Sequence, residues 1–283
     1  MAQAHVSTAI GGNAEIPRIR DITVADVIDA LRHGFEDFWE HPSHYAFAAM
    51  IYPVVIVVIG LWVSGRNVLP LLYPLASGFA LIGPFVALIF YEISRRAELG
   101  LDTSWKHGFA ALRSPAFPAM LGVGLLLCVL FIAWLIVAQI LFTGLFGAQQ
   151  PASITAMLGQ ILTNSQGWTL IVLGNLIGAV FALVVLAISV VSFPLMLDRH
   201  MGARAAIETS IRATSVNAWP VLVWGFLIAV LIAIGMATLF LGLVIIMPAL
   251  GHASWHLYRK MVEPQSDRTV RTRRAGGGST QAT

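Results

Sequence analysis

The residues most able to do chemistry in this sequence are histidines and charged side chains at the ends of long apolar runs. His252 and His256 are four residues apart, so a helix would place them on one face, a spacing that can hold a metal ion or sit beside haem. No carboxylate or cysteine lies near them in the sequence to complete a ligand set. Trp255 and Tyr258 mark the same stretch as a membrane interface, where a histidine is commonly solvated. We therefore expect no bound metal ion and no cofactor.

Three short clusters of charged residues follow apolar runs and would gather on one side of a membrane. Such groups commonly pair along their own helix, but they could also line the mouth of a path for protons or anions. Both interpretations stay open. The members of this candidate cytoplasmic mouth are Glu92, Arg95, Arg96, Asp198, Arg199, His256, Arg259 and Lys260.

Motifs of the common enzyme classes are missing from the sequence. No glycine-rich phosphate loop precedes a basic residue and a hydroxyl, no nucleophile elbow occurs, and no set of His and carboxylate has catalytic spacing. Cys128 is the single cysteine, which excludes a disulfide framework and a cysteine-based metal site. The net charge of +3 comes from bases at the edges of apolar runs and in the C-terminal tail. We expect no catalytic residue and no nucleic-acid partner.

The elements that position these residues are long uncharged runs. Hydrophobic residues make up 58% of the 283 residues and charged residues only 11%, and no charge occurs between Arg113 and Asp198 or between Arg212 and Arg259. Because about 20 apolar residues cross a bilayer, these runs predict an all-α membrane protein surrounded by lipid. Six spans are expected, at 45–63, 68–91, 118–142, 168–197, 219–234 and 238–258. The last two could also form one long helix in place of a hairpin near Gly235.

The distribution of Lys and Arg favours six spans over five. With six, Arg66 is the only one of the 17 Lys and Arg residues on the outer side. The sequence therefore predicts a multi-pass membrane protein with both termini in the cytoplasm. No cleavable signal peptide is visible before Ile22, so the first span should act as its own insertion signal.

A segment with amphipathic helical spacing precedes each pair of spans. The first follows Thr23 as N-cap, the second starts at Asp102 and stops before Pro115, and the third covers about 202–217. The first has an acidic polar face, which suits packing on the protein or a partner better than binding anionic headgroups. The order of one helix and two spans predicts a triplication with units 21–91, 102–197 and 202–258 inside one membrane domain of 21–262. Residues 1–20 should be flexible, and residues 263–283 should form a disordered basic tail.

Small and polar residues within the third and fourth spans predict contacts between them. Gly174 and Gly178 form a small-xxx-small pair, which is typical of close helix packing. The amides of Gln139 and Asn175 lie in the same third of the membrane and could hydrogen-bond across the two helices, worth about 0.6–2 kcal/mol. On the outer side, the residues after Pro151 have the spacing of a short surface helix.

Three stretches of sequence resemble the bacterial family called domain of unknown function 2189. They are residues 91–96, which read YEISRR, residues 192–199, which read SFPLMLDR, and residues 251–259, which read GHASWHLYR. The resemblance covers roughly 21–262 and implies an inner-membrane protein without assigning a chemistry. Some family members carry a cytochrome c oxidase label, which would imply haem-ligating histidines within spans. This sequence has no histidine near the middle of any expected span.

Two functions follow from these patterns. The first is a noncatalytic membrane scaffold or accessory subunit, which would use its cytoplasmic amphipathic helices to contact a membrane-protein partner or a second copy. The second is a transporter of small molecules or lipid with a polar cytoplasmic mouth. The repeated hairpins and the prolines within spans favour this function. A haem- or metal-associated, oxidase-related protein is a third and more distant reading.

Overall fold

Helices make up the regular structure of this computed structural model in the residues it describes, which are 17–40, 74, 81, 83–147, 153–238 and 242–264. The expected first span, most of the second before residue 83, and the expected flexible ends 1–16 and 265–283 lie outside the described residues. The helices are α1 (Val24–Glu40), α4 (Gly83–Val86), α5 (Leu88–Glu98), α6 (Trp105–Gly108), the 3-10 helix η3 (Phe109–Arg113), α7 (Phe117–Phe146), α8 (Ile154–Thr163), α9 (Ser165–Ser189), α10 (Ser192–Arg199), α11 (Ala203–Val216), α12 (Ala218–Ala237) and α13 (Leu243–Met261).

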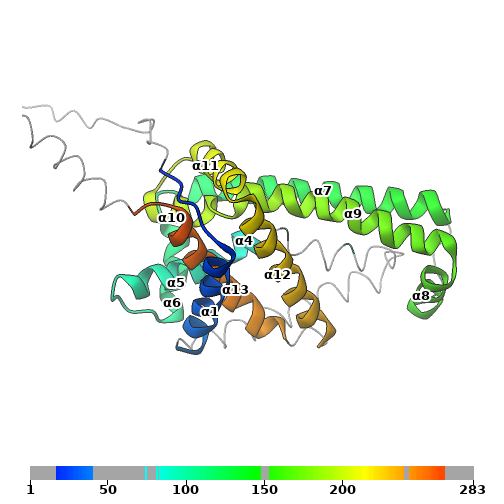
Figure 1. Cartoon of the computed structure of the whole chain (residues 1–283), viewed down its shortest axis with the longest axis horizontal. Helices are drawn as coiled ribbons and strands as arrows, with labels where there is room; N and C mark the ends of the chain where they lie inside the picture. The colour runs from blue at the N-terminus through cyan, green and yellow to red at the C-terminus, as the bar shows by residue number, and fades with distance from the viewer. Residues whose placement is uncertain are drawn as a thin grey trace, which may run out of the picture.

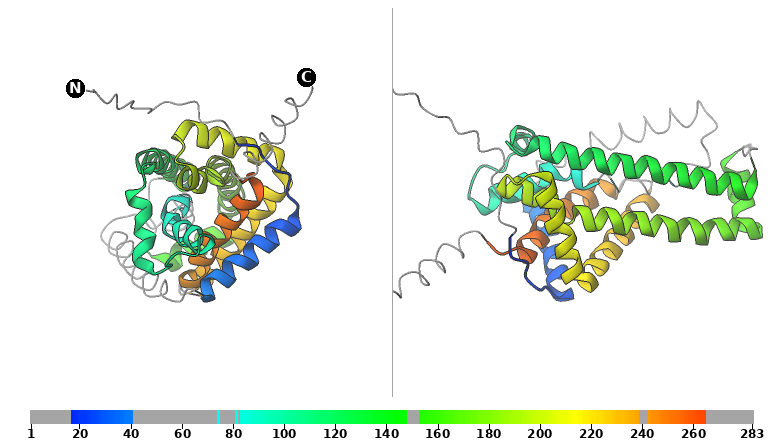
Figure 2. Two further views of the ribbon diagram at one scale, coloured as in Figure 1. Left: turned by 90° about the vertical axis from the view of Figure 1, so that its left-hand side faces the viewer. Right: turned by 90° about the horizontal axis from the view of Figure 1, so that it is seen from above.

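The molecule has an elongated part made of long helices and a cluster of shorter ones at one end. α7 and α9 run side by side away from the cluster, with α8 at their far end (Figures 1 and 2). α7 has 30 residues, which corresponds to about 45 Å at 1.5 Å per residue and exceeds the thickness of the hydrocarbon core. Its sides carry large exposed apolar residues, among them Leu125, Val129 and Ile140, as expected of a surface that faces lipid. The short helix expected after Pro151 is present as α8.

The expected fourth span is interrupted near its C-terminal end. α9 ends at Ser189, and α10 begins at Ser192 after a two-residue turn. Pro194 explains the turn, because a proline lacks the N–H that would bond to the carbonyl four residues earlier and its ring crowds that carbonyl. The buried hydroxyl of Ser210, on α11, accepts the N–H of Val191 at 3.2 Å and so replaces one of the lost helical bonds.

The expected fifth and sixth spans are two separate helices that pack on each other, so the alternative of one long helix is wrong. α12 ends at Ala237 and α13 begins at Leu243. A Cβ on Gly235 would lie 2.4 Å from Cδ2 of Leu243, so this glycine permits the close approach of the two helices. The hydroxyl of Thr238 accepts the N–H of Gly242 at 2.9 Å and closes the turn.

The three segments expected to precede the spans differ in regularity. Thr23 caps α1 as expected: the N–H of Asp26 donates to its hydroxyl at 3.3 Å, and Asp26 in return accepts the N–H of Thr23 at 2.9 Å. The third segment forms α11. The second is not one helix but the short α6 followed by η3, and Ser114 next to Pro115 is extended, as expected of a residue that precedes proline.

α1 lies along α13, and this contact is the most extensive between any two described helices (Figure 2). The face of α1 that is buried there contains Val27, Ala30, Gly34 and Phe38. A Cβ on Gly34 would lie 2.4 Å from Cβ of Ala253 and 2.5 Å from the carbonyl oxygen of Ala249, so only glycine allows the two backbones to come this close. The apolar face of α1 therefore packs on the protein itself.

The segment before α1 forms hydrogen bonds with the end of α13. Ile19 pairs with Val262 in an isolated antiparallel bridge, and the N–H of Arg20 donates to the carbonyl of Met261 at 2.8 Å. Asn217, buried between α11 and α12, accepts the N–H of Ile22 at 2.8 Å through its side-chain oxygen. The two ends of the described chain therefore lie at the same end of the molecule.

Candidate functional site

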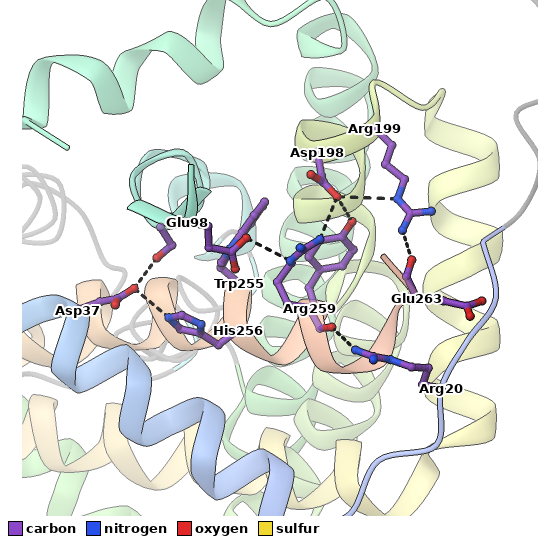
Figure 3. A network of polar contacts seen from close by, with 11 residues as sticks. Arg20, Asp37, Glu98, Asp198, Arg199, Trp255, His256, Arg259 and Glu263 are labelled. Carbon is purple, nitrogen blue, oxygen red and sulfur yellow. Dashed lines mark hydrogen bonds and ion pairs between the residues drawn. The ribbon is translucent and has the colours of Figure 1, made fainter. Parts of the chain in front are cut away.

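The charged residues that the sequence singled out surround the C-terminal half of α13. Figure 3 shows side chains from α10 and α13, together with Asp37 of α1 and Glu98 of α5, directed toward one another in this region. Most of α13 here is buried, with Trp255, Leu257 and Tyr258 fully so. The candidate mouth is thus a set of ion pairs and hydrogen bonds between helices, which we call the polar layer, defined by the eight sequence-predicted residues and their partners Asp26, Asp29, Asp37, Ser94, Glu98, His252, Trp255 and Tyr258.

The first cluster of the polar layer lies within α5. Glu92 is only 2% exposed and accepts two hydrogen bonds from the guanidinium of Arg95, at 2.8 and 2.9 Å. The guanidinium of Arg96 lies 3.9 Å from the same carboxylate. The bonds to Glu92 raise the pKa of Arg95. The negative charge of Asp198 on α10 raises this pKa further, so the first and second clusters interact electrostatically. The pairing along one helix that the sequence allowed is confirmed.

The second cluster joins α10 to α13 and α5. Asp198 accepts the hydroxyl of Tyr258 at 2.6 Å and lies 3.7 Å from the guanidinium of Arg259 and 3.8 Å from that of Arg199. Arg259 also pairs with Glu98 at 3.2 Å. Because one arginine bridges carboxylates from two other helices, Arg259 holds three elements together. Arg199 donates in addition to the carbonyl of Glu263, just beyond α13.

The third cluster joins α1 to α13 and α5 through one carboxylate. Asp37 lies 2.9 Å from Nε2 of His256 and accepts the hydroxyl of Ser94 at 2.8 Å. Nδ1 of His252 lies 2.7 Å from that hydroxyl. Burial by itself raises the pKa of Asp37, but the hydrogen bonds from His256 and Ser94 and the charges of both histidines outweigh it and hold this pKa below its ordinary value. The carboxylate is therefore ionised at neutral pH and ties the three helices together.

Two further contacts fix the end of α13 from outside. The ammonium group of Lys260 lies 2.7 Å from Asp29 and 3.5 Å from Asp26, both on α1. The guanidinium of Arg20 donates to the carbonyls of Arg259 and Lys260 at the last turn of the helix, at 2.6 and 3.0 Å. Carbonyls of the last turn have no partner inside a helix, so a cation here satisfies them and complements the helix dipole.

The charged residues of the polar layer were predicted from the sequence, but most of the residues that bind them were not. Glu98 accepts the indole N–H of Trp255 at 3.0 Å, although Trp255 had been read as a membrane-interface marker. His252 is fully buried beside Phe90, so the expectation of a solvated histidine is wrong for this residue. The acidic face of α1, which the sequence did show, was the one signal that could have pointed to basic partners elsewhere in the chain.

Ser94 connects Asp37 to His252 in the buried part of the polar layer. Its hydroxyl lies 2.8 Å from Asp37 and 2.7 Å from Nδ1 of His252, whereas this nitrogen lies 3.7 Å from Asp37. Ser94 and His252 are both fully buried. In the described part of the chain, no group of three or more His, Cys, Asp and Glu side chains is arranged to hold a metal ion.

The predicted contacts between the third and fourth spans fall between α7 and α9. A Cβ on Gly178 would lie 3.1 Å from the ring of Trp134, and one on Gly174 would lie 3.8 Å from Leu141. The side-chain amide of Asn175 donates to the carbonyl of Ile171 in its own helix at 2.7 Å. Its bond to Gln139 stays a prediction.

The class of protein follows from the long helices. Three stretches of the described residues are long and apolar enough to cross a membrane: α7, the stretch Ser165–Arg199 that contains α9 and α10, and α12. Together with the family match below, they define an integral membrane protein.

The family resemblance is confirmed over part of the chain. Residues 72–198 match the model of the DUF2189 family, described as predicted integral membrane proteins. The match includes the stretch 91–96 and all but the last residue of 192–199, and it does not extend to 251–259. No curated protein and no solved structure matches this chain.

Proposed function

We propose that this protein is a noncatalytic scaffold or accessory subunit of a bacterial plasma membrane, which presents a rigid cytoplasmic platform to another membrane protein. The observation that carries the proposal is the pairing within the polar layer. Its carboxylates and bases bind each other across α1, α5, α10 and α13, which locks these helices together. A mouth that passes ions would need charged groups whose partner is the solute.

Exposed apolar side chains on this platform supply a surface for a partner. Trp39 at the end of α1 is 66% exposed, and Leu99 after α5 is 58% exposed. Leu101, Trp105 and Leu112 are exposed in the same loop and helices that follow α5. Large apolar residues outside the spans favour contacts with protein, and tryptophan is enriched at such interfaces.

The alternative function, transport with a polar cytoplasmic mouth, needs a polar cavity at mid-depth. The cavity described below lies among the helices and is lined mainly by apolar side chains. Its chemistry favours the lipid form of the alternative over the transport of polar solutes.

We also propose the topology of six spans in three hairpins with both termini in the cytoplasm. The pairing of Ile19 with Val262 supports an even number of crossings, because it places the two residues on the same side of the membrane. α7 runs away from the cluster of shorter helices, and α9 returns to it (Figure 1). The order of a short helical segment and two long helices occurs at α6–η3, α7 and α9 and again at α11, α12 and α13, which supports the proposed repeat.

Thiol labelling in intact cells tests this topology. In a Cys128→Ser background, a membrane-impermeant maleimide should label Gln160→Cys in α8 directly, and should label Asp21→Cys and Glu263→Cys only after the membrane is permeabilised. Labelling of Asp21→Cys and Glu263→Cys from opposite sides would contradict an even number of spans. Labelling of both from outside would reverse the orientation alone.

Photo-crosslinking in native membranes tests the platform. A photoreactive amino acid at Trp39 or at Leu101 should form an adduct with one discrete membrane protein or with a second copy of the chain. The same probe at Arg204, whose side chain is 92% exposed, serves as the control and should form none. Phe38 is fully buried and is therefore unsuitable for the test. Adducts with lipid alone at both positions would contradict the scaffold role.

A further inference from the structure

A half-enclosed cavity of about 570 Å³ lies between α9 and α12, with α5 and α13 behind it. We call it the wedge, because the two helices touch at one end and separate toward the other. A Cβ on Gly225 of α12 would lie 2.8 Å from Leu186 near the cytoplasmic end of α9, which marks the point of contact. Beyond that point α12 diverges from α9 (Figure 1). The volume lies within the range of about 300–1,000 Å³ typical of ligand sites.

The walls of the wedge are built from small and apolar residues. α9 contributes Gly174, Gly178 and Ala182, and α12 contributes Ala229 and Ala233, each set spaced four residues apart on one face. Small residues on both helices would allow α9 and α12 to pack more closely, yet the two helices are held apart. The space therefore results from the contacts that hold α9 and α12 in place.

Several polar groups on the walls already have partners within the protein, among them the indole N–H of Trp134, which donates to the carbonyl of Pro74 at 3.1 Å. The hydroxyl of Ser189 donates to the carbonyl of Val185, and the hydroxyl of Ser254 donates to that of Leu250, both at 2.7 Å. A cavity of this kind offers water few partners, so it suits an apolar occupant. An unfilled cavity would also cost its lining the dispersion contacts that a neighbour provides.

Because α9 and α12 are themselves candidate spans, the medium beside the wedge is lipid. We infer that the wedge is a lateral binding site for an acyl chain of a membrane phospholipid, which enters between α9 and α12. The chain fills the space that the small residues leave, and the polar layer keeps the helices from closing on it. This site is independent of the proposed scaffold role, which rests on the cytoplasmic platform.

Native mass spectrometry of the full-length protein tests the inference. Protein purified from membranes of phosphatidylethanolamine and phosphatidylglycerol should retain about one phospholipid after washing with detergent. The double variant Ala182→Phe, Ala229→Phe fills the wedge and should lower the retained fraction about tenfold. The control Val180→Phe, Val230→Phe places the same aromatic side chains on the same two helices at positions outside the cavity lining and should retain lipid like the wild type. Equal retention by both double variants, or none by the wild type, would overturn the proposal.

A second measurement does not depend on the folding of the bulky variant. A photoreactive amino acid at Ala233, on the wall of the wedge, should form an adduct with the mass of a phospholipid when irradiated in membranes. An adduct with residues 41–82 of the same chain, or with a second copy, would show that protein fills the wedge and would refute lipid binding. The scaffold role would be unaffected by that result.

Discussion

Replacing Glu92 with alanine is expected to lower the free energy of unfolding by about 3 kcal/mol, because it leaves Arg95 and Arg96 without their shared carboxylate. Glu92 is 2% exposed and makes two short bonds to Arg95. Removing one member of a buried ion pair commonly costs about 3–5 kcal/mol, and the partial exposure of Arg95 places this case at the lower end. Thermal unfolding in mild detergent, followed by intrinsic tryptophan fluorescence, measures the effect.

A matched pair of charges on α11 provides the control for Glu92. Arg204 and Glu208 form the same kind of contact at 2.9 Å, but Arg204 is 92% exposed. Surface pairs are worth about 0–1 kcal/mol, so Glu208→Ala should unfold near the wild-type temperature. If both alanine variants lower the unfolding temperature equally, the burial of Glu92 contributes nothing to stability. The polar layer would then not hold the helices together as we describe.

The second large effect is expected at Gly34, where leucine should separate α1 from α13. The new side chain would start within 2.5 Å of backbone atoms of Ala249 and Ala253, which cannot move without displacing the helix. Overpacking costs about 1–3 kcal/mol where side chains can adjust, and we expect at least the upper end here because the obstacle is backbone. Asp37 and His256 would also lose their contact, since α1 carries the carboxylate.

Limited proteolysis together with thermal unfolding measures the effect at Gly34. Gly34→Leu should unfold at a lower temperature and be cleaved within residues 17–40 well before the wild type. Gly122→Leu on α7 is the control, because a Cβ there meets nothing within 4 Å and should leave both measurements unchanged. A Gly34→Leu protein as resistant as the wild type would mean that α1 does not depend on this close packing.

The membrane class and the order of the helices could be predicted from the sequence because both depend on local chemistry. Long uncharged runs favour a lipid environment, and α7 and α12 appear within a few residues of their expected bounds, whereas the expected fourth span is divided between α9 and α10. The cap at Thr23 and the short helix α8 were also predicted, since each depends on neighbours a few residues away. The break between α9 and α10 was missed, although Pro194 was visible as a possible kink.

The arrangement of the polar layer and the wedge was beyond the sequence for a physical reason. Asp37 and His256 are 219 positions apart, and nothing in either segment alone encodes that they meet. Glycine at position 34 is compatible with many structures, and only the crossing of α1 over α13 makes it necessary. Composition and periodicity determined that the chain is a helical membrane protein whose charges lie at the ends of apolar runs. The tertiary structure decided that those charges bind each other and that α9 and α12 stay apart, because both depend on which helices become neighbours.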